Sequence, residues 1–266
     1  MLSIAGTDPL RGAGIDADCW TALQHQCQAC WVQTCVVDQD STGVFVVERL
    51  PVESLRRRLR RTLDDTRPSV WKLGLAPGAD VVDLVSELAM EYRPSWLVID
   101  PVLRGGTASA PELADPGIVP ALWNLGRACV RAGIGVLITP NAPELAALTG
   151  APDPRDPTQL TELANALSTE SGMSVLAKGG HLPVGRGHDV LVHQGVATSL
   201  QPGVMRASDI HGTGCHLSAA IAAGLAHDGE LSVELVEGAR RWLRALPVVQ
   251  VGRGRVQFDH MRGGLR

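Results

Sequence analysis

Short apolar segments of strand type alternate with helical segments along most of this chain, and this alternation is what most constrains its fold. Residues 70–74 and 96–101 are strand-like, and the segment between them carries apolar residues at helical spacing. The alternation continues through residues 134–139 and 174–177. Strands separated by helices form a parallel sheet that is covered on both faces. The sequence therefore predicts an α/β fold: a three-layer αβα sandwich with a mostly parallel central sheet.

The other segments fit the same scheme. We expect strands at residues 3–5 and 31–37, a polar loop at 38–43, a helix at 158–169, a hairpin of 190–193 with 196–200 that turns at Gln194 and Gly195, and a last helix at 233–246. The basic tail from residue 248 to 266 is predicted to be loose. Because no internal repeat, linker or break in composition divides the sequence, residues 1–266 are expected to form a single domain.

Composition and charge exclude several classes of function. At 266 residues with 45% hydrophobic content, the chain is long and apolar enough for a full core. Its formal net charge of -4 gives no general attraction to nucleic acid or to an anionic membrane. No apolar run is long enough to cross a bilayer, and the first residues lack the pattern of a signal peptide. We expect a cytoplasmic protein with neither nucleic-acid nor membrane partners.

The six cysteines do not form the framework of a disulfide-rich domain in a chain of this length. Cys27 and Cys30 make one C-x-x-C pair, which is compatible with a metal or redox site. No second pair follows at the spacing of a zinc site. The sequence favours buried structural thiols over a metal or redox centre.

A glycine-punctuated turn leads into an apolar, alanine-rich helix at residues 208–223. Gly212, Thr213, Gly214 and Cys215 are predicted to lie at the start of that helix. Free backbone N–H groups, the helix dipole and the small glycines together make such a start an anion-binding site. A thiol there tends to have a lowered pKa, so Cys215 is a candidate nucleophile or proton acceptor. The alternative is a buried helix in which Cys215 serves as a small hydrophobic residue.

Further polar loops follow the predicted strands. A glycine-rich loop spans Gly6 to Gly14, and a second loop begins at Asn141. Loops at the carboxyl edge of an α/β sheet are where such proteins bind small ligands. Only Lys72 and Lys178 of the 24 basic side chains are lysine. Lys178 stands in a Gly-Gly turn, where the compact charge of a lysine suits the binding of a phosphate. The alternative is that a lysine occurs at this position by chance.

Six short motifs occur in order along the chain. They are Ile4-Ala5-Gly6-Thr7-Asp8-Pro9, Gly12-Ala13-Gly14-Ile15-Asp16-Ala17-Asp18, Asp100-Pro101-Val102, Ile138-Thr139-Pro140-Asn141-Ala142-Pro143-Glu144, Lys178-Gly179-Gly180-His181 and His211-Gly212-Thr213-Gly214-Cys215. In this order they resemble the hydroxymethylpyrimidine and phosphomethylpyrimidine kinases of thiamine biosynthesis, in the ribokinase-like superfamily. The resemblance covers residues 2–229.

The resemblance implies transfer of a phosphoryl group from ATP, with Mg²⁺, to 4-amino-5-hydroxymethyl-2-methylpyrimidine and then to its monophosphate. It implies that the backbone N–H groups of Gly212, Thr213 and Gly214 donate to the transferring phosphoryl group. It also implies that Cys215 is the base that takes the proton of the attacking hydroxyl. The other roles that it implies are ATP-phosphate binding by Lys178, a magnesium region at Asp100, Asn141 and Glu144, and a pyrimidine pocket lined by Gly6, Asp18, Gln39 and Val102. Helix capping is the alternative role of Asp100 and Asn141, and a place in the first turn of a helix is the alternative role of Glu144. The resemblance also implies a homodimer.

The chain departs from the family pattern at several positions. These are Leu10-Arg11-Gly12, Asp40-Ser41, Leu75, Leu103-Arg104-Gly105-Gly106-Thr107 and Asp209. In the loop after Val102 an arginine, Arg104, stands where relatives have a lysine that closes over the phosphates. Two alternatives to the pyrimidine kinase therefore stay open: a pyridoxal kinase of the same superfamily, and a non-catalytic relative that only binds the pyrimidine.

Overall fold

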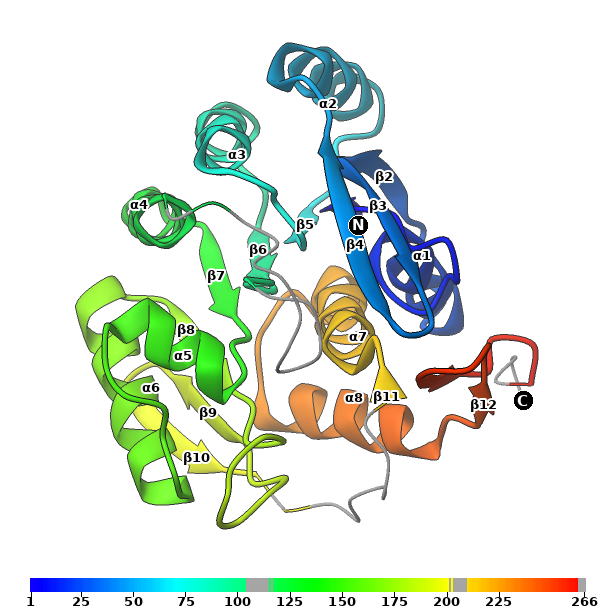
Figure 1. Cartoon of the computed structure of the whole chain (residues 1–266). Coiled ribbons are helices and arrows are strands. Elements are labelled where there is room, and N and C mark those ends of the chain that lie inside the picture. Colours follow the sequence, from blue (N-terminus) through cyan, green and yellow to red (C-terminus); the bar gives the residue numbers. More distant parts are fainter. Residues whose placement is uncertain (104–114, 116, 201, 203–209, 263–266) are drawn as a thin grey trace.

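The computed structural model describes residues 1–103, 115, 117–200, 202 and 210–262. An eight-stranded sheet forms its middle layer (Figure 1). The strands are β1 Leu2–Ala5, β2 Cys30–Gln33, β5 Val70–Leu73, β6 Trp96–Ile99, β7 Gly135–Ile138, β8 Ser174–Ala177, β9 Val190–His193 and β10 Val196–Ser199. Their spatial order is β10-β9-β8-β7-β6-β5-β1-β2. Neighbours from β2 to β8 pair in parallel, and β9 pairs antiparallel with both β8 and β10.

Helices cover both faces of this sheet, as the alternation predicts. One face packs against α2 Val52–Thr66, α3 Ala79–Tyr92, α4 Ile118–Arg131, α5 Ala142–Thr149 and α6 Pro157–Ser171. The other face packs against α1 Gly14–Gln24, α7 Thr213–Asp228 and α8 Val233–Ala245. The three-layer αβα sandwich is therefore confirmed (Figure 1).

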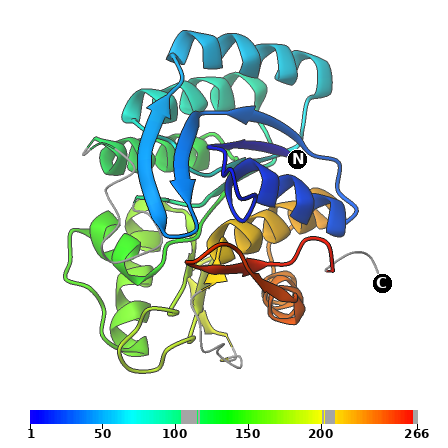
Figure 2. The same ribbon diagram turned by 45° about the vertical axis from the view of Figure 1, so that its right-hand side comes forward.

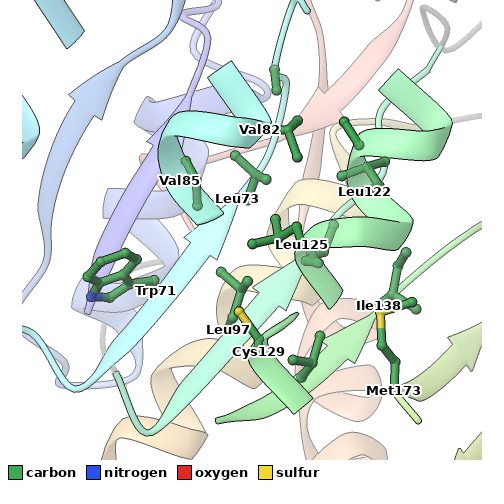
Figure 3. Close-up of a cluster of buried hydrophobic side chains, with 14 of the residues drawn as sticks. Trp71, Leu73, Val82, Val85, Leu97, Leu122, Leu125, Cys129, Ile138 and Met173 are labelled. Atoms are coloured by element: carbon green, nitrogen blue, oxygen red, sulfur yellow. The ribbon is translucent and has the colours of Figure 1, made fainter. Parts of the chain in front are cut away.

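The core explains why the central strands β6 and β7 carry no polar side chains. Leu97 and Ile99 of β6 join the cluster under α2 to α6, whereas Val98 between them joins the cluster under α1, α7 and α8. Successive side chains of a strand point to opposite faces, so a strand covered on both sides is apolar at every position. Figure 3 shows the first cluster, where Leu122 and Leu125 of α4 and Val82 and Val85 of α3 pack over the strands.

The strand predicted at residues 31–37 is in fact two strands. The chain leaves the main sheet after β2 and forms a separate antiparallel hairpin from β3 Cys35–Asp40 and β4 Gly43–Arg49. Residues 38–40, predicted as part of a loop, lie within β3, and the turn is at Ser41 and Thr42. A continuous strand-type sequence does not show where a chain changes from one sheet to another, because the change depends on partners far away in the sequence.

The prediction of a loose tail is wrong for residues 248–258. β11 Ile210–His211, β13 Val256–Phe258 and β12 Val248–Gln250 form a three-stranded sheet in that order. Phe258 is fully buried. Figure 2 shows this red segment close to the tip of the β3–β4 hairpin, where the backbone N–H of Arg255 donates to the Ser41 carbonyl at 2.8 Å. Helices long and apolar enough to span a membrane are absent from the described part of the chain.

Candidate active site

A cavity of about 410 Å³ opens at the carboxyl ends of the central strands. Residues that follow β1, β5, β6, β7 and β8 all contribute to its wall, as does the start of α7. Most of the predicted site residues line it: Gly6, Gln39, Asp100, Val102, Asn141, Glu144, Lys178, Gly212, Thr213, Gly214 and Cys215. Its volume lies in the usual range for a small-molecule site.

Two glycines shape the anion loop at the start of α7, which we define as Gly212, Thr213 and Gly214. Gly212 has φ of 83°, and a Cβ there would lie 1.7 Å from the carbonyl oxygen of Gly12. A Cβ on Gly214 would lie 3.1 Å from the Lys178 Nζ. Side chains at these positions would therefore separate the helix start from the glycine-rich loop and crowd the lysine. The free N–H groups of the first turn face the cavity as a ready anion site.

Lys178 lies directly opposite this loop and pairs with Asp100. Its Nζ donates to Asp100 Oδ1 at 3.2 Å. Thr139 and Ser218 also donate to the Asp100 carboxylate, at 3.2 Å and 3.4 Å. Burial alone would raise the pKa of Asp100, but the charges of Lys178 and Lys72 hold it below its usual value. Asp100 is thus a buried carboxylate that keeps the ammonium of Lys178 at the cavity wall.

Asn141 and Glu144 both cap α5 and line the cavity. The Asn141 side chain accepts from the Glu144 N–H at 2.9 Å, while the Asn141 N–H donates to Glu144 Oε2 at 2.8 Å. This reciprocal capping box is the capping role that the sequence left as an alternative. Burial raises the pKa of Glu144 to about 7, although Lys178 opposes the shift. The carboxyl group of Glu144 can therefore change its charge near neutral pH.

Cys215 is a thiol rather than the thiolate that a helix start favours. Burial raises its pKa to about 12, and nearby Asp100 and Asp18 add to the rise, while Lys72 and the N–H of Gly14 oppose it. The expectation of a lowered pKa of Cys215 is therefore wrong. Desolvation and two carboxylates outweigh the helix dipole here.

Asp18 and Lys72 form a buried ion pair beneath the cavity. The Lys72 Nζ donates to Asp18 Oδ1 at 2.7 Å and Oδ2 at 2.9 Å, and both side chains have 0% exposure. Ser3 donates a further hydrogen bond to Asp18 at 2.6 Å. Lys72 is part of the cavity wall, whereas Asp18, which the resemblance assigned to the pyrimidine pocket, lies behind it. Sequence reasoning noted that lysine is rare in this chain but gave Lys72 no role.

The carboxylates suit a magnesium ion that is shared with a nucleotide. Mg²⁺ is usually held by one or two carboxylates together with water and substrate phosphates. Asp100 and Glu144 supply two carboxyl groups beside the lysine and the anion loop. Clusters of three or more His, Cys, Asp or Glu side chains that would hold a metal without phosphates are absent from the described residues.

Sequence reasoning also missed the part of the cavity wall that Asp8, His211 and Arg255 form. His211, at the end of β11, donates from Nε2 to Asp8 Oδ2 at 2.9 Å, which joins the anion loop to the loop after β1. Burial would raise the pKa of Asp8, but the hydrogen bonds from His211 and from the Leu10 N–H hold it below the usual value. Arg255, from the tail, lies beside His211. The six motifs carried no signal for Arg255, because the tail was expected to be loose.

Backbone donors and a lysine that neutralise phosphates, next to carboxyl groups for a divalent cation, are what phosphoryl transfer requires. On an αβα sandwich with its site at the carboxyl edge of the sheet, they define a phosphotransferase with a ribokinase-like fold.

Comparison with known proteins narrows this class to one family. The family model for phosphomethylpyrimidine kinase matches residues 8–258, and the chain belongs to this family. It is 34% identical over 258 residues to the hydroxymethylpyrimidine/phosphomethylpyrimidine kinase of Escherichia coli, covering 95% of this chain and 94% of that protein.

Two solved structures show the same fold. The phosphomethylpyrimidine kinase of Clostridium difficile 630 is 28% identical, with a TM-score of 0.75 over 91% of this chain and 96% of that one. The Bacillus subtilis pyridoxal kinase in its ADP complex is 26% identical, with a TM-score of 0.86 over 97% of this chain and 96% of that one.

Proposed function

We propose that this chain transfers the γ-phosphoryl group of ATP to 4-amino-5-hydroxymethyl-2-methylpyrimidine and to the monophosphate of that alcohol, in thiamine biosynthesis. The observation that carries the proposal is the cavity in which the anion loop faces the Lys178–Asp100 pair. Membership of the phosphomethylpyrimidine kinase family supports the choice of acceptor. A homodimer, a single domain and a cytoplasmic location remain predictions from the resemblance and the composition.

On the donor side, Lys178 binds the phosphates of ATP. Its ammonium is fixed by Asp100 at 3.2 Å and lies across from the N–H groups of the anion loop. Asp100 and Glu144, with Asn141 beside them, would hold Mg²⁺, which when bound neutralises charge on the phosphates. The capping box keeps Glu144 and Asn141 in place before any ligand arrives.

On the acceptor side, Gly6, Gln39 and Val102 form the pyrimidine pocket. Gln39 is in β3 of the separate hairpin, and Gly6 follows β1 of the main sheet. The amide of Gln39 can donate and accept at once, which suits a ring nitrogen beside an amino group. Asp18 acts on this pocket only through Lys72, because it lies behind that side chain.

The hydroxyl acceptor must lose a proton during transfer. Cys215 is the residue that the family resemblance makes the base, yet its pKa of about 12 keeps the thiol protonated at neutral pH. In a loose transition state the bond to the attacking oxygen is only slightly formed, so the hydroxyl can keep its proton until late in the reaction. We therefore propose that the Cys215 thiol first orients the hydroxyl. Once this thiol has released its own proton to solvent, the thiolate, whose charge Lys72 and the Gly14 N–H stabilise, accepts the hydroxyl proton and becomes the neutral thiol again.

The deciding experiment measures ADP release by the purified protein with MgATP and, separately, the hydroxymethylpyrimidine, its monophosphate and pyridoxal. ADP release with both pyrimidines is the expected result. Preference for pyridoxal would replace the proposal by the second candidate, which is favoured by the TM-score of 0.86 to the B. subtilis enzyme. Binding of a pyrimidine without ADP release would indicate the non-catalytic alternative.

The role of Lys178 is tested in the same assay. Lys178→Ala removes the ammonium that the site directs at the phosphates, so the KM for ATP should rise at least about tenfold. Arg58→Ala, on the exposed face of α2, is the matched control and should leave that KM unchanged. An unaltered response of Lys178→Ala to ATP would remove Lys178 from the donor site.

A further inference from the structure

The Arg255 side chain lines the cavity near Gln39 and His211, and two of its three guanidinium nitrogens are buried without a hydrogen-bond partner among the described residues. Arg255 follows the turn between β12 and β13, and its backbone is fixed by the 2.8 Å hydrogen bond to the Ser41 carbonyl. Its side chain lines the main cavity and also a small adjoining hollow beside Gln39 and Gln257. The tail that was expected to be loose thus brings a cation into the site.

The two nitrogens of Arg255 that have no partner within the described chain, Nε and Nη2, are the pair with which an arginine binds oxyanions. Nη1 of Arg255 donates to His211 Nδ1 at 3.4 Å. Nε and Nη2 are buried and have no hydrogen-bond partner among the described residues. These two nitrogens lie on one edge of the guanidinium, where their parallel N–H groups match two oxygens of a phosphate or carboxylate. Leaving charged donors buried without a partner is costly, so the arrangement favours a ligand that supplies both oxygens.

The charged groups near Arg255 do not form an ion pair with its guanidinium in the described part of the chain. His211 accepts from Arg255 with Nδ1 and donates from Nε2 to Asp8, so its ring supplies no negative charge to the guanidinium. Ion pairs between Arg255 and a carboxylate are absent from the described part of the chain. His211 also directly precedes Gly212, so Arg255 is held beside the anion loop.

We infer that Arg255 binds the phosphate of the monophosphate acceptor, and that it is a specificity residue for the second phosphorylation. This inference rests on the proposed function. In the second reaction an oxygen of the acceptor phosphate bonds to the γ-phosphorus of ATP, and the bond from that phosphorus to the ADP oxygen breaks. The attacking oxygen is already anionic, so the step needs an anion-binding group rather than a base. The alcohol acceptor offers no oxyanion to Arg255.

The test compares kcat/KM for the two acceptors in the wild-type protein, Arg255→Gln and Arg255→Lys. The ratio of kcat/KM for the monophosphate to that for the alcohol should fall at least about tenfold in Arg255→Gln, because two charge-assisted hydrogen bonds are lost. Arg255→Lys keeps the charge but not the paired donors, so its ratio should also fall. Arg253→Gln changes an exposed arginine of the same turn and should leave the ratio at the wild-type value.

Several results would overturn the inference. A parallel loss with both acceptors would assign Arg255 a structural role, and a higher KM for ATP with an unchanged acceptor ratio would place it on the donor phosphates. If the wild-type protein released ADP with neither pyrimidine, the proposed function would fail. Calorimetric binding of the monophosphate would then test Arg255 separately: equal affinity of wild type and Arg255→Gln would refute its role.

Discussion

Replacing Lys72 by methionine tests whether the buried pair beneath the cavity is a structural requirement of the site. Lys72 and Asp18 are both inaccessible to solvent, and their contacts of 2.7 Å and 2.9 Å join β5 to α1. Methionine has a similar length but no charge, so Lys72→Met leaves the Asp18 carboxylate buried with only the hydroxyl of Ser3 at 2.6 Å. Breaking a buried pair in this way costs about 3–5 kcal/mol.

Such a loss is a large part of the free energy of unfolding of an ordinary domain, which is about 5–15 kcal/mol. The assay is urea unfolding at pH 7, followed by circular dichroism, for the wild type, Lys72→Met, and Lys72→Met combined with Asp18→Asn. The double variant removes both charges, while the amide oxygen of the introduced asparagine can still accept from Ser3. It should therefore recover at least about 1.5 kcal/mol of the loss.

The pH dependence gives an independent check. With Lys72 absent, burial should raise the pKa of Asp18 in the folded state above its value in the unfolded chain. The unfolded chain then ionises first as pH rises, so the deficit of Lys72→Met should be smaller at pH 5 than at pH 8. The reasoning is refuted if Lys72→Met unfolds within about 1 kcal/mol of the wild type, or if the double variant is no more stable than the single one.

Two further predictions concern the thiol and the tail. Because burial raises the pKa of Cys215 to about 12, its alkylation by iodoacetamide at pH 8 should be about a thousandfold slower than that of a free cysteine. Peptide mapping, with Cys215→Ala as the control, measures this rate. Alkylation at the rate of a free cysteine would contradict the raised pKa. Phe258→Ala removes a fully buried ring that packs on His216. The substitution should lower the free energy of unfolding by about 3 kcal/mol and allow trypsin to cleave the tail at Arg255. A tail as resistant to trypsin as in the wild type would show that Phe258 does not hold it.

Most of the architecture was predictable because it follows from local patterns. The mainly apolar strands and the helices between them require a sheet covered on both faces, and that sheet places the loops after β1, β6, β7 and β8 at one edge. The anion loop was predictable for the same reason, since a glycine turn before an alanine-rich helix is a local signal. The capping box of Asn141 and Glu144 is local as well.

Other features depend on contacts between residues that are distant in sequence. Lys72 meets Asp18 across 54 positions, and the turn before Arg255 is held on Ser41, more than 200 positions earlier. The position of β3 outside the main sheet likewise depends on β4 as its partner. Pairings of this kind leave no periodicity in the sequence, so neither the role of Asp18 nor the ordered tail could be predicted from it.

The sequence by itself determined the layers of this protein, the loops at the carboxyl edge of its sheet, and the glycine turn before α7 that we propose binds the transferring phosphoryl group, because each depends on residues close together in the chain. Only the tertiary structure decided the charge states and the closure of the site. The pKa of Cys215 depends on burial and on the distant Asp100, Asp18 and Lys72. Arg255 is part of the cavity wall only because the last strands pack against β11.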